Sequence, residues 1–99
     1  MLIRIVRMMF QPDKLAEFET IFLASRDKIR AFPGCHHLEL WHDLENPNVR
    51  ITHSHWESAD ALEAYRNSAL FKTTWAVTKP LFTERPLAFS AQKADNLDS

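Results

Sequence analysis

The chain has 99 residues, with 12 Lys or Arg against 13 Asp or Glu and a formal net charge of −1. This length allows one domain with one modest core. The balanced charge excludes the basic surface that is typical of nucleic-acid binding. No apolar run approaches the ~20 residues that span a membrane. The single cysteine, Cys35, excludes an intrachain disulfide and favours a reducing compartment, so we expect a cytoplasmic protein.

The first part of the sequence predicts a strand, a helix and a second strand. Residues 2–10 are rich in Ile, Val, Met and Phe and contain no breaker, which favours a strand. Pro12 suits the first turn of a helix, and apolar residues then recur at steps of three and four over residues 15–32. Pro33-Gly34 ends this helix, and residues 35–43 predict the second strand.

A hairpin, two helical segments and a last strand follow. Residues 45–48 (Glu-Asn-Pro-Asn) are typical of a turn, so residues 49–56 are expected to pair with the preceding strand. Ser58 is a candidate N-cap, and the helical pattern continues in two parts until Pro80. Residues 87–92 then predict a final strand.

The order β-α-β-β-α-β is typical of a ferredoxin-like α+β fold with an antiparallel sheet. We expect one domain over residues 1–92 and a polar C-terminal tail over residues 93–99. Helices on one side leave the other face of the four-stranded sheet bare, although it also carries apolar side chains. A second copy of the sheet is the simplest cover for that face, so we expect a homodimer.

Three segments of the sequence carry a more specific pattern. They are IVRMMFQPDKLAEF, FPGCHHLELWHDLENPN and HSHWESADALEAYRNSALF, and the most specific piece is the Trp-Glu-Ser-x-x-Ala-Leu run from Trp56 to Leu62, with Phe71 downstream. Over about residues 2–92 the sequence resembles the antibiotic biosynthesis monooxygenase family. The resemblance implies a small dimeric α+β barrel.

Members of that family differ in chemistry. Some oxidise polycyclic phenols or quinols with O2 and no cofactor, and others degrade haem. The resemblance therefore implies a cofactor-independent monooxygenase whose partners are a small aromatic substrate and O2, with no nucleic acid and no membrane. The alternative is a non-catalytic dimeric module that binds a small aromatic compound or a stress metabolite. Haem degradation and metal-dependent activity are the remaining alternatives.

The resemblance also implies positions for the site. In the cofactor-free enzymes an Asn and a Trp on the third strand and a Tyr on the next helix line the pocket, and here these positions hold Thr52, Trp56 and Leu62. The haem-degrading branch uses an Asn, a Trp and an axial His. The positions that match them here hold Arg7, Tyr65 and Trp75, and haem iron needs a strong ligand.

The resemblance implies a pocket between the sheet and the helices, and strand periodicity then sorts the residues that line it. If Trp56 faces the helices, Thr52 and Ser54 do so too. A hairpin that is symmetric about Asn46 places His36 opposite Trp56. On the first strand we expect the odd-numbered residues on the same face. The expected lining, which suits a planar aromatic ligand, is Arg7, His36, Leu38, Thr52, Ser54, Trp56, Tyr65, Phe71 and Trp75.

Two of these residues are candidate catalytic groups. His36 has an intrinsic pKa near neutrality and could take a phenol proton as a general base, and Arg7 could hold the resulting anion. The structural alternatives are that His36 caps the sheet edge and Arg7 pairs with a carboxylate. The expected substrate-binding residues are Thr52, Ser54, Trp56, Tyr65, Phe71 and Trp75, although large aromatic side chains also serve as core. We expect no cofactor.

The opposite face of the hairpin collects a second group of polar residues. The symmetric register places His37 opposite His55 and Glu39 opposite His53. Three imidazoles and one carboxylate are ligands for Zn, Fe or Ni. However, this face is also expected to meet the partner sheet, where a hydrogen-bonded polar interface would use the same residues, so no metal site is predicted.

Overall fold

The computed structural model describes residues 1–94, so most of the expected polar tail at 93–99 lies outside the described residues. One antiparallel sheet has the strand order β2-β3-β1-β4. This order confirms the ferredoxin-like fold class. The strands are β1 (Leu2–Met9), β2 (Cys35–His42), β3 (Val49–Trp56) and β4 (Leu87–Ala91).

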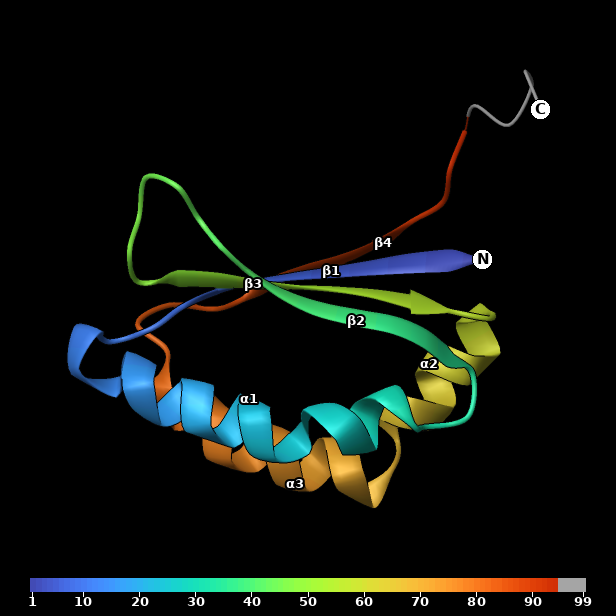
Figure 1. Ribbon diagram of the computed structural model, residues 1–99, viewed down its shortest axis with the longest axis horizontal. Helices are drawn as coiled ribbons and strands as arrows, with labels where there is room; N and C mark the ends of the chain where they lie inside the picture. The colour runs from blue at the N-terminus through green and yellow to red at the C-terminus, as the bar shows by residue number, and fades with distance from the viewer. Residues whose placement is uncertain (95–99) are drawn as a thin grey trace.

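The helices all lie on one face of this sheet, and within the described residues the other face carries no element (Figure 1). They are α1 (Leu15–Arg30), α2 (Ala59–Arg66) and α3 (Ala69–Thr78), with short 3-10 turns η1 (Pro12–Lys14) and η2 (Lys79–Leu81). Ser58 caps α2 as expected, since its Oγ accepts a hydrogen bond from the Ala61 amide at 3.1 Å. Within residues 1–94 no helix has the length and apolar character that crossing a membrane requires.

The core lies between the sheet and α1, and its tightest contact forms just after β1. Phe10 is fully buried and stacks on Phe18 with ring centroids 4.2 Å apart. Since Phe10 faces the helices, period two directs the even-numbered residues of β1 inward as well. The expectation that the odd-numbered residues, Arg7 among them, face the helices is therefore wrong. Both faces of β1 are apolar in sequence, so alternation alone does not choose between them.

The hairpin register is largely the expected one. His37 pairs with His55, Glu39 with His53, and Leu38 with Ser54. The exception is at the start of β2, where Cys35 rather than His36 pairs with Trp56. One extra residue in β2 forms a β-bulge there, and a bulge leaves that residue out of the regular alternation. The predicted pairing of His36 with Trp56 is wrong for this reason.

Gly34 connects α1 to β2 at a position that only glycine fits. Its φ is +89°, and a Cβ added there would lie 2.5 Å from the Cβ of Ala61 on α2. Both the backbone conformation and the close approach exclude a side chain. The sharp turn brings β2 back beneath α1. It also places Gly34 close to Ala61, near the start of α2.

We expect Gly34→Ala to lower the free energy of unfolding by about 1–3 kcal/mol, because it adds backbone strain and a steric clash. Ala61→Gly removes the atom that clashes. The double variant should therefore show a favourable coupling energy in urea denaturation once the helix cost of Ala61→Gly alone is subtracted. An unchanged midpoint for Gly34→Ala would contradict this role of Gly34.

Candidate functional site

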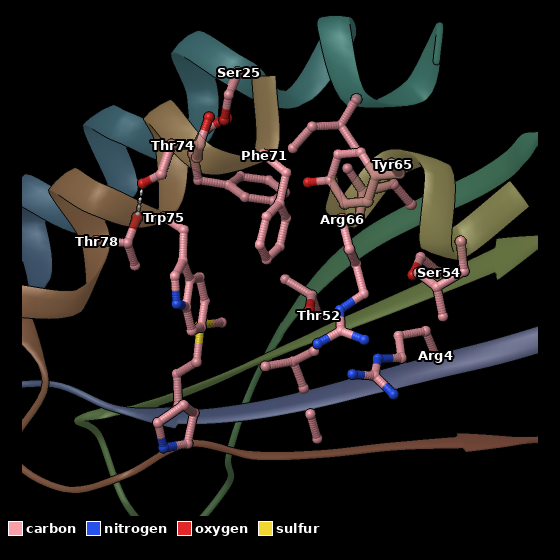
Figure 2. Close-up of a pocket in the computed structure, with 18 of the residues that line it drawn as sticks. Arg4, Ser25, Thr52, Ser54, Tyr65, Arg66, Phe71, Thr74, Trp75 and Thr78 are labelled. Carbon is pink, nitrogen blue, oxygen red and sulfur yellow. Dashed lines mark hydrogen bonds between the residues drawn. The ribbon is translucent and has the colours of Figure 1, made fainter. Parts of the chain in front are cut away.

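A cavity of about 270 Å³ lies between the helices and the inner face of the sheet (Figure 2). Its walls are mainly apolar and aromatic, as in most small-molecule sites. Each of the three α-helices and each of the four strands contributes to it. The lining residues are Arg4, Val6, Met8, Phe18, Ile21, Phe22, Ser25, Ile29, Leu38, Thr52, Ser54, Trp56, Leu62, Tyr65, Arg66, Phe71, Thr74, Trp75, Thr78, Pro86 and Ala88.

Four aromatic side chains form a continuous wall of this cavity. Trp56 stacks on Tyr65 with centroids 4.8 Å apart, and Tyr65 meets Phe71 edge-on at 5.2 Å. Phe71 in turn stacks on Trp75 at 5.7 Å. The buried Trp56 indole donates to Ser54 Oγ at 3.0 Å, which fixes the ring against β3. The wall offers flat π surfaces for a planar ligand.

Two arginines supply the positive charge of the cavity. Arg4 extends from β1 and Arg66 from α2, and their guanidinium groups lie on the same side of the cavity (Figure 2). Burial, together with the neighbouring charge of Arg66, lowers the pKa of Arg4. Arg66 contacts Glu63 at 3.4 Å. Arg4 forms no ion pair with any described residue, and its guanidinium donates instead to Ser90 Oγ at 3.1 Å. An anion would therefore find an unneutralised partner here.

The Tyr65 hydroxyl is a neutral donor at the aromatic wall. Burial raises the pKa of Tyr65 to about 12 because a buried phenolate loses its hydration. Its oxygen points toward the interior of the cavity in Figure 2. At neutral pH this group keeps its proton, so it is available to donate a hydrogen bond to an oxygen atom of a ligand.

The expected site residues fall into two groups. The structure brings Thr52, Ser54, Trp56, Tyr65, Phe71 and Trp75 together around the cavity, with Leu38. His36 and Arg7 do not lie there, which corrects their expected position. Arg7 lies on the opposite face of the sheet, where it pairs with Ile51. His36 is half-exposed at the bulge and lies 3.8 Å from Glu57.

Sequence reasoning missed both arginines of the cavity. Arg4 was missed because the other set of β1 residues was expected to face the helices. The burial of Phe10 decides which set does so, and that burial depends on tertiary contacts. Arg66 left a weaker signal in the sequence. It follows Leu62 by four residues on α2, and residues four apart share a face of a helix. Among the described residues that line the cavity, none is a carboxylate, an imidazole or a thiol.

Tyr65 gives a direct optical test of the buried site, because it is the only tyrosine in the sequence. Alkaline absorbance titration should show tyrosinate forming with a midpoint near 12. Since the unfolded tyrosine ionises near 10, the free energy of unfolding should fall as the pH rises from about 10 to 12. A midpoint near 10 while circular dichroism remains native would contradict this environment.

Comparisons with known proteins agree with this architecture. The sequence matches the model of the antibiotic biosynthesis monooxygenase family over residues 1–76. No curated protein matches significantly. A Bordetella bronchiseptica structure that bears the family's name is 26% identical, with 94% of this chain and 96% of that chain aligned and a TM-score of 0.84. The corresponding structure from Caulobacter crescentus CB15 is 25% identical, with 95% and 90% aligned and a TM-score of 0.88.

A third solved structure, Rv0793 from Mycobacterium tuberculosis, shares the fold at 21% identity, with 97% of each chain aligned and a TM-score of 0.88. The family match covers all of β1, α1, β2, β3 and α2, and most of α3. It also includes every aromatic residue of the cavity wall. The chain therefore belongs to the antibiotic biosynthesis monooxygenase family, as the resemblance in its sequence implied.

Proposed function

We propose that this protein is a cofactor-independent monooxygenase that oxidises a planar quinol or phenol with O2. Family membership supports monooxygenase-like chemistry. The observation that carries the finer proposal is a cavity with four aromatic residues along one wall and two arginines beside it. A flat aromatic substrate would stack on Phe71 and Trp75 and direct its hydroxyl toward the arginines.

Arg4 is the group that would activate the substrate. A phenolate is far more electron-rich than a phenol, so ionisation is what prepares the ring to react with O2. A guanidinium in a partly desolvated cavity stabilises this anion and lowers the pKa of the bound hydroxyl. The neutral Tyr65 hydroxyl would add a hydrogen bond to the same oxygen or to a second oxygen of the ring system.

The reaction balances without an external reductant. The bound anion transfers one electron to O2, and recombination of the two radicals forms a carbon–oxygen bond to a ring carbon that carries hydrogen. Protonation gives a hydroperoxide at that carbon. Loss of water then breaks the O–O bond and leaves a carbonyl, so the product is a quinone. One oxygen atom enters the product, the other becomes water, and both hydrogens of that water come from the substrate.

His36 and Arg7 remain predictions as catalytic residues, and their positions outside the cavity favour Arg4 in the anion-holding role. The absence of an ionisable base among the described lining residues supports a second candidate function, binding of a small aromatic anion without turnover. Haem degradation is less well supported, since an axial ligand is required and none of the lining residues is a histidine.

The activity prediction compares two arginines on one strand. With anthrones in air-saturated buffer, wild-type protein should accelerate formation of the quinone, which gains one oxygen atom from O2, without added flavin, haem or metal. Arg4→Met should reduce kcat/KM by about 10-fold to 100-fold, the effect expected for loss of one charge-assisted hydrogen bond. The matched control Arg7→Met, three residues away on the opposite face, should retain the wild-type rate. Quinone absorbance measures both.

Three other outcomes would change the assignment. If Arg7→Met or His36→Ala lowers the rate and Arg4→Met does not, the anion site lies elsewhere. If no substrate is oxidised above its spontaneous rate but several bind with micromolar affinity, and Arg4→Met weakens that binding, the protein is a binding module. If substrates neither bind nor react, the cavity does not serve planar phenols.

We also infer that the protein is a homodimer that pairs through the bare face of the sheet. Apolar side chains are exposed on that face: Leu87 at 59%, Phe89 at 48% and Trp41 at 42%. They come from β4 and β2 at the two edges of the sheet, with Ile5 of β1 opposite Phe89. Monomers rarely expose apolar side chains across a whole sheet face, and a second sheet would cover them.

Sedimentation at micromolar concentration should show a dimer for the wild-type chain. Phe89→Asp should give a monomer, because it places a charge among the exposed apolar side chains that the partner sheet would cover. Leu23→Asp is the matched control, because Leu23 is 60% exposed on α1 and away from the sheet. A monomeric wild-type chain, or equal dissociation by both variants, would contradict the interface.

A further inference from the structure

A second cluster of polar side chains lies on the bare face of the sheet, across β2 and β3 from the cavity. His37 and Glu39 lie on β2, directly opposite His55 and His53 on β3. One possible ligand atom from each of His37, Glu39 and His53 lies within 4.8 Å of the other two. The cavity chemistry uses none of these residues.

The distances within this cluster are close to those of a metal site. His37 Nε2 lies 3.2 Å from Glu39 Oε2, and His53 Nδ1 lies 3.4 Å from Glu39 Oε1. Ligands about 2.0–2.2 Å from a tetrahedral ion are themselves about 3.3–3.6 Å apart. Each imidazole therefore lies at about this spacing from one oxygen of Glu39, His37 from Oε2 and His53 from Oε1. A shift of the three side chains that brings one atom of each to this spacing, from within 4.8 Å, would complete the set.

The hydrogen bonding of His53 points to the same arrangement. Its Nδ1 is buried and has no hydrogen-bond partner among the described residues, although a carboxylate oxygen is near. Its Nε2 lies 3.3 Å from Nε2 of His55. If Nε2 of His53 donates to His55, then Nδ1 carries the free lone pair. A metal-bound histidine has this pattern, with one nitrogen on the ion and the other fixed by a hydrogen bond.

Trp41 holds the other parts of the cluster in place. Its indole Nε1 donates to Glu39 Oε1 at 3.1 Å, which orients the carboxylate. Its ring stacks on His53 with centroids 4.5 Å apart and an interplanar angle of 15°. Both ligands are thus positioned by a neighbour that does not itself bind an ion. Such outer contacts are characteristic of working metal sites.

A hydrogen-bonded polar cluster is the competing explanation, and it accounts for fewer of these contacts. One carboxylate, Glu39, would have to serve two imidazoles, and the third imidazole is packed against both, with His55 ring centroids 5.1 Å from His37 and 4.7 Å from His53. In the structure His53 Nδ1 lies 3.4 Å from Glu39 Oε1 but makes no hydrogen bond with it or with any other described residue. A single cation at the point shared by the three ligand atoms satisfies it.

We propose that His37, Glu39 and His53 bind one divalent first-row transition metal ion of the Zn²⁺ type, with His55 and Trp41 as positioning residues. Two nitrogens and one carboxylate oxygen suit Zn²⁺, Co²⁺ or Ni²⁺ better than Mg²⁺ or Ca²⁺, which prefer oxygen ligands. The side chains of His37 and Glu39 are 42% and 45% exposed, so the remaining coordination position is open to water or to a group from a second copy.

The test uses full-length, tag-free protein after dialysis against a chelator. Calorimetric titration with Zn²⁺ should give one ion per chain with micromolar or tighter affinity, and Co²⁺ should give the visible absorption of a low-coordinate site. His53→Gln, His37→Gln and Glu39→Gln should each weaken Zn²⁺ binding by about 100-fold or more. His55→Gln should weaken it by about 10-fold to 100-fold, as loss of an outer hydrogen bond does, while the shape of the Co²⁺ spectrum is kept.

His42→Gln is the matched control, because His42 is an exposed histidine on the same strand and should bind Zn²⁺ as the wild type does. Far-UV circular dichroism checks that each variant folds, and Glu39→Gln keeps an oxygen for Trp41, so it is the variant least expected to disturb the fold. No stoichiometric binding by the wild type would overturn the metal site. Equal losses of Zn²⁺ affinity in His42→Gln and Glu39→Gln would overturn the metal site as well.

Discussion

The side on which Phe10 is buried decides what each face of the sheet contains. Phe10 is enclosed by Phe18 and Phe82, and its amide donates to the carbonyl of Asn48 at 2.9 Å. These contacts decide which residues of the preceding strand, β1, face the helices and which face the other side of the sheet. A slip of one residue would exchange every side chain of β1 between the two faces. Arg4 would then leave the cavity, and Arg7 would enter it.

The elements themselves follow closely from local sequence. The third strand has the predicted bounds, and Ser58 caps the helix that follows it. The hairpin register was predictable because the turn at residues 45–48 sets it, with the Asp43 carboxylate accepting from the amides of Glu45 and Asn46. These features depend on residues that are close in the chain, so the pattern of the chain is enough to specify them.

The candidate site was only partly predictable, since some of its features depend on distant contacts. Part of the aromatic wall could be inferred locally, because Phe71 and Trp75 are four residues apart on one helix and share a face. Trp56 and Tyr65 were placed with them by the family resemblance. The β-bulge that displaces His36 has no local signal, since it depends on how β2 meets the end of β3. The Arg4 position depends on the facing of β1. The charged groups were therefore harder to place than the apolar ones.

The three tryptophans are divided between the two faces of the sheet. Trp56, only 1% exposed, and Trp75 both line the cavity, whereas Trp41 stacks on His53 on the bare face. Each indole therefore has a different local polarity and a different neighbour able to quench its emission. The protein thus carries two intrinsic fluorophores at its ligand cavity and one on its bare sheet surface. Events on the two faces can be followed separately without any added label.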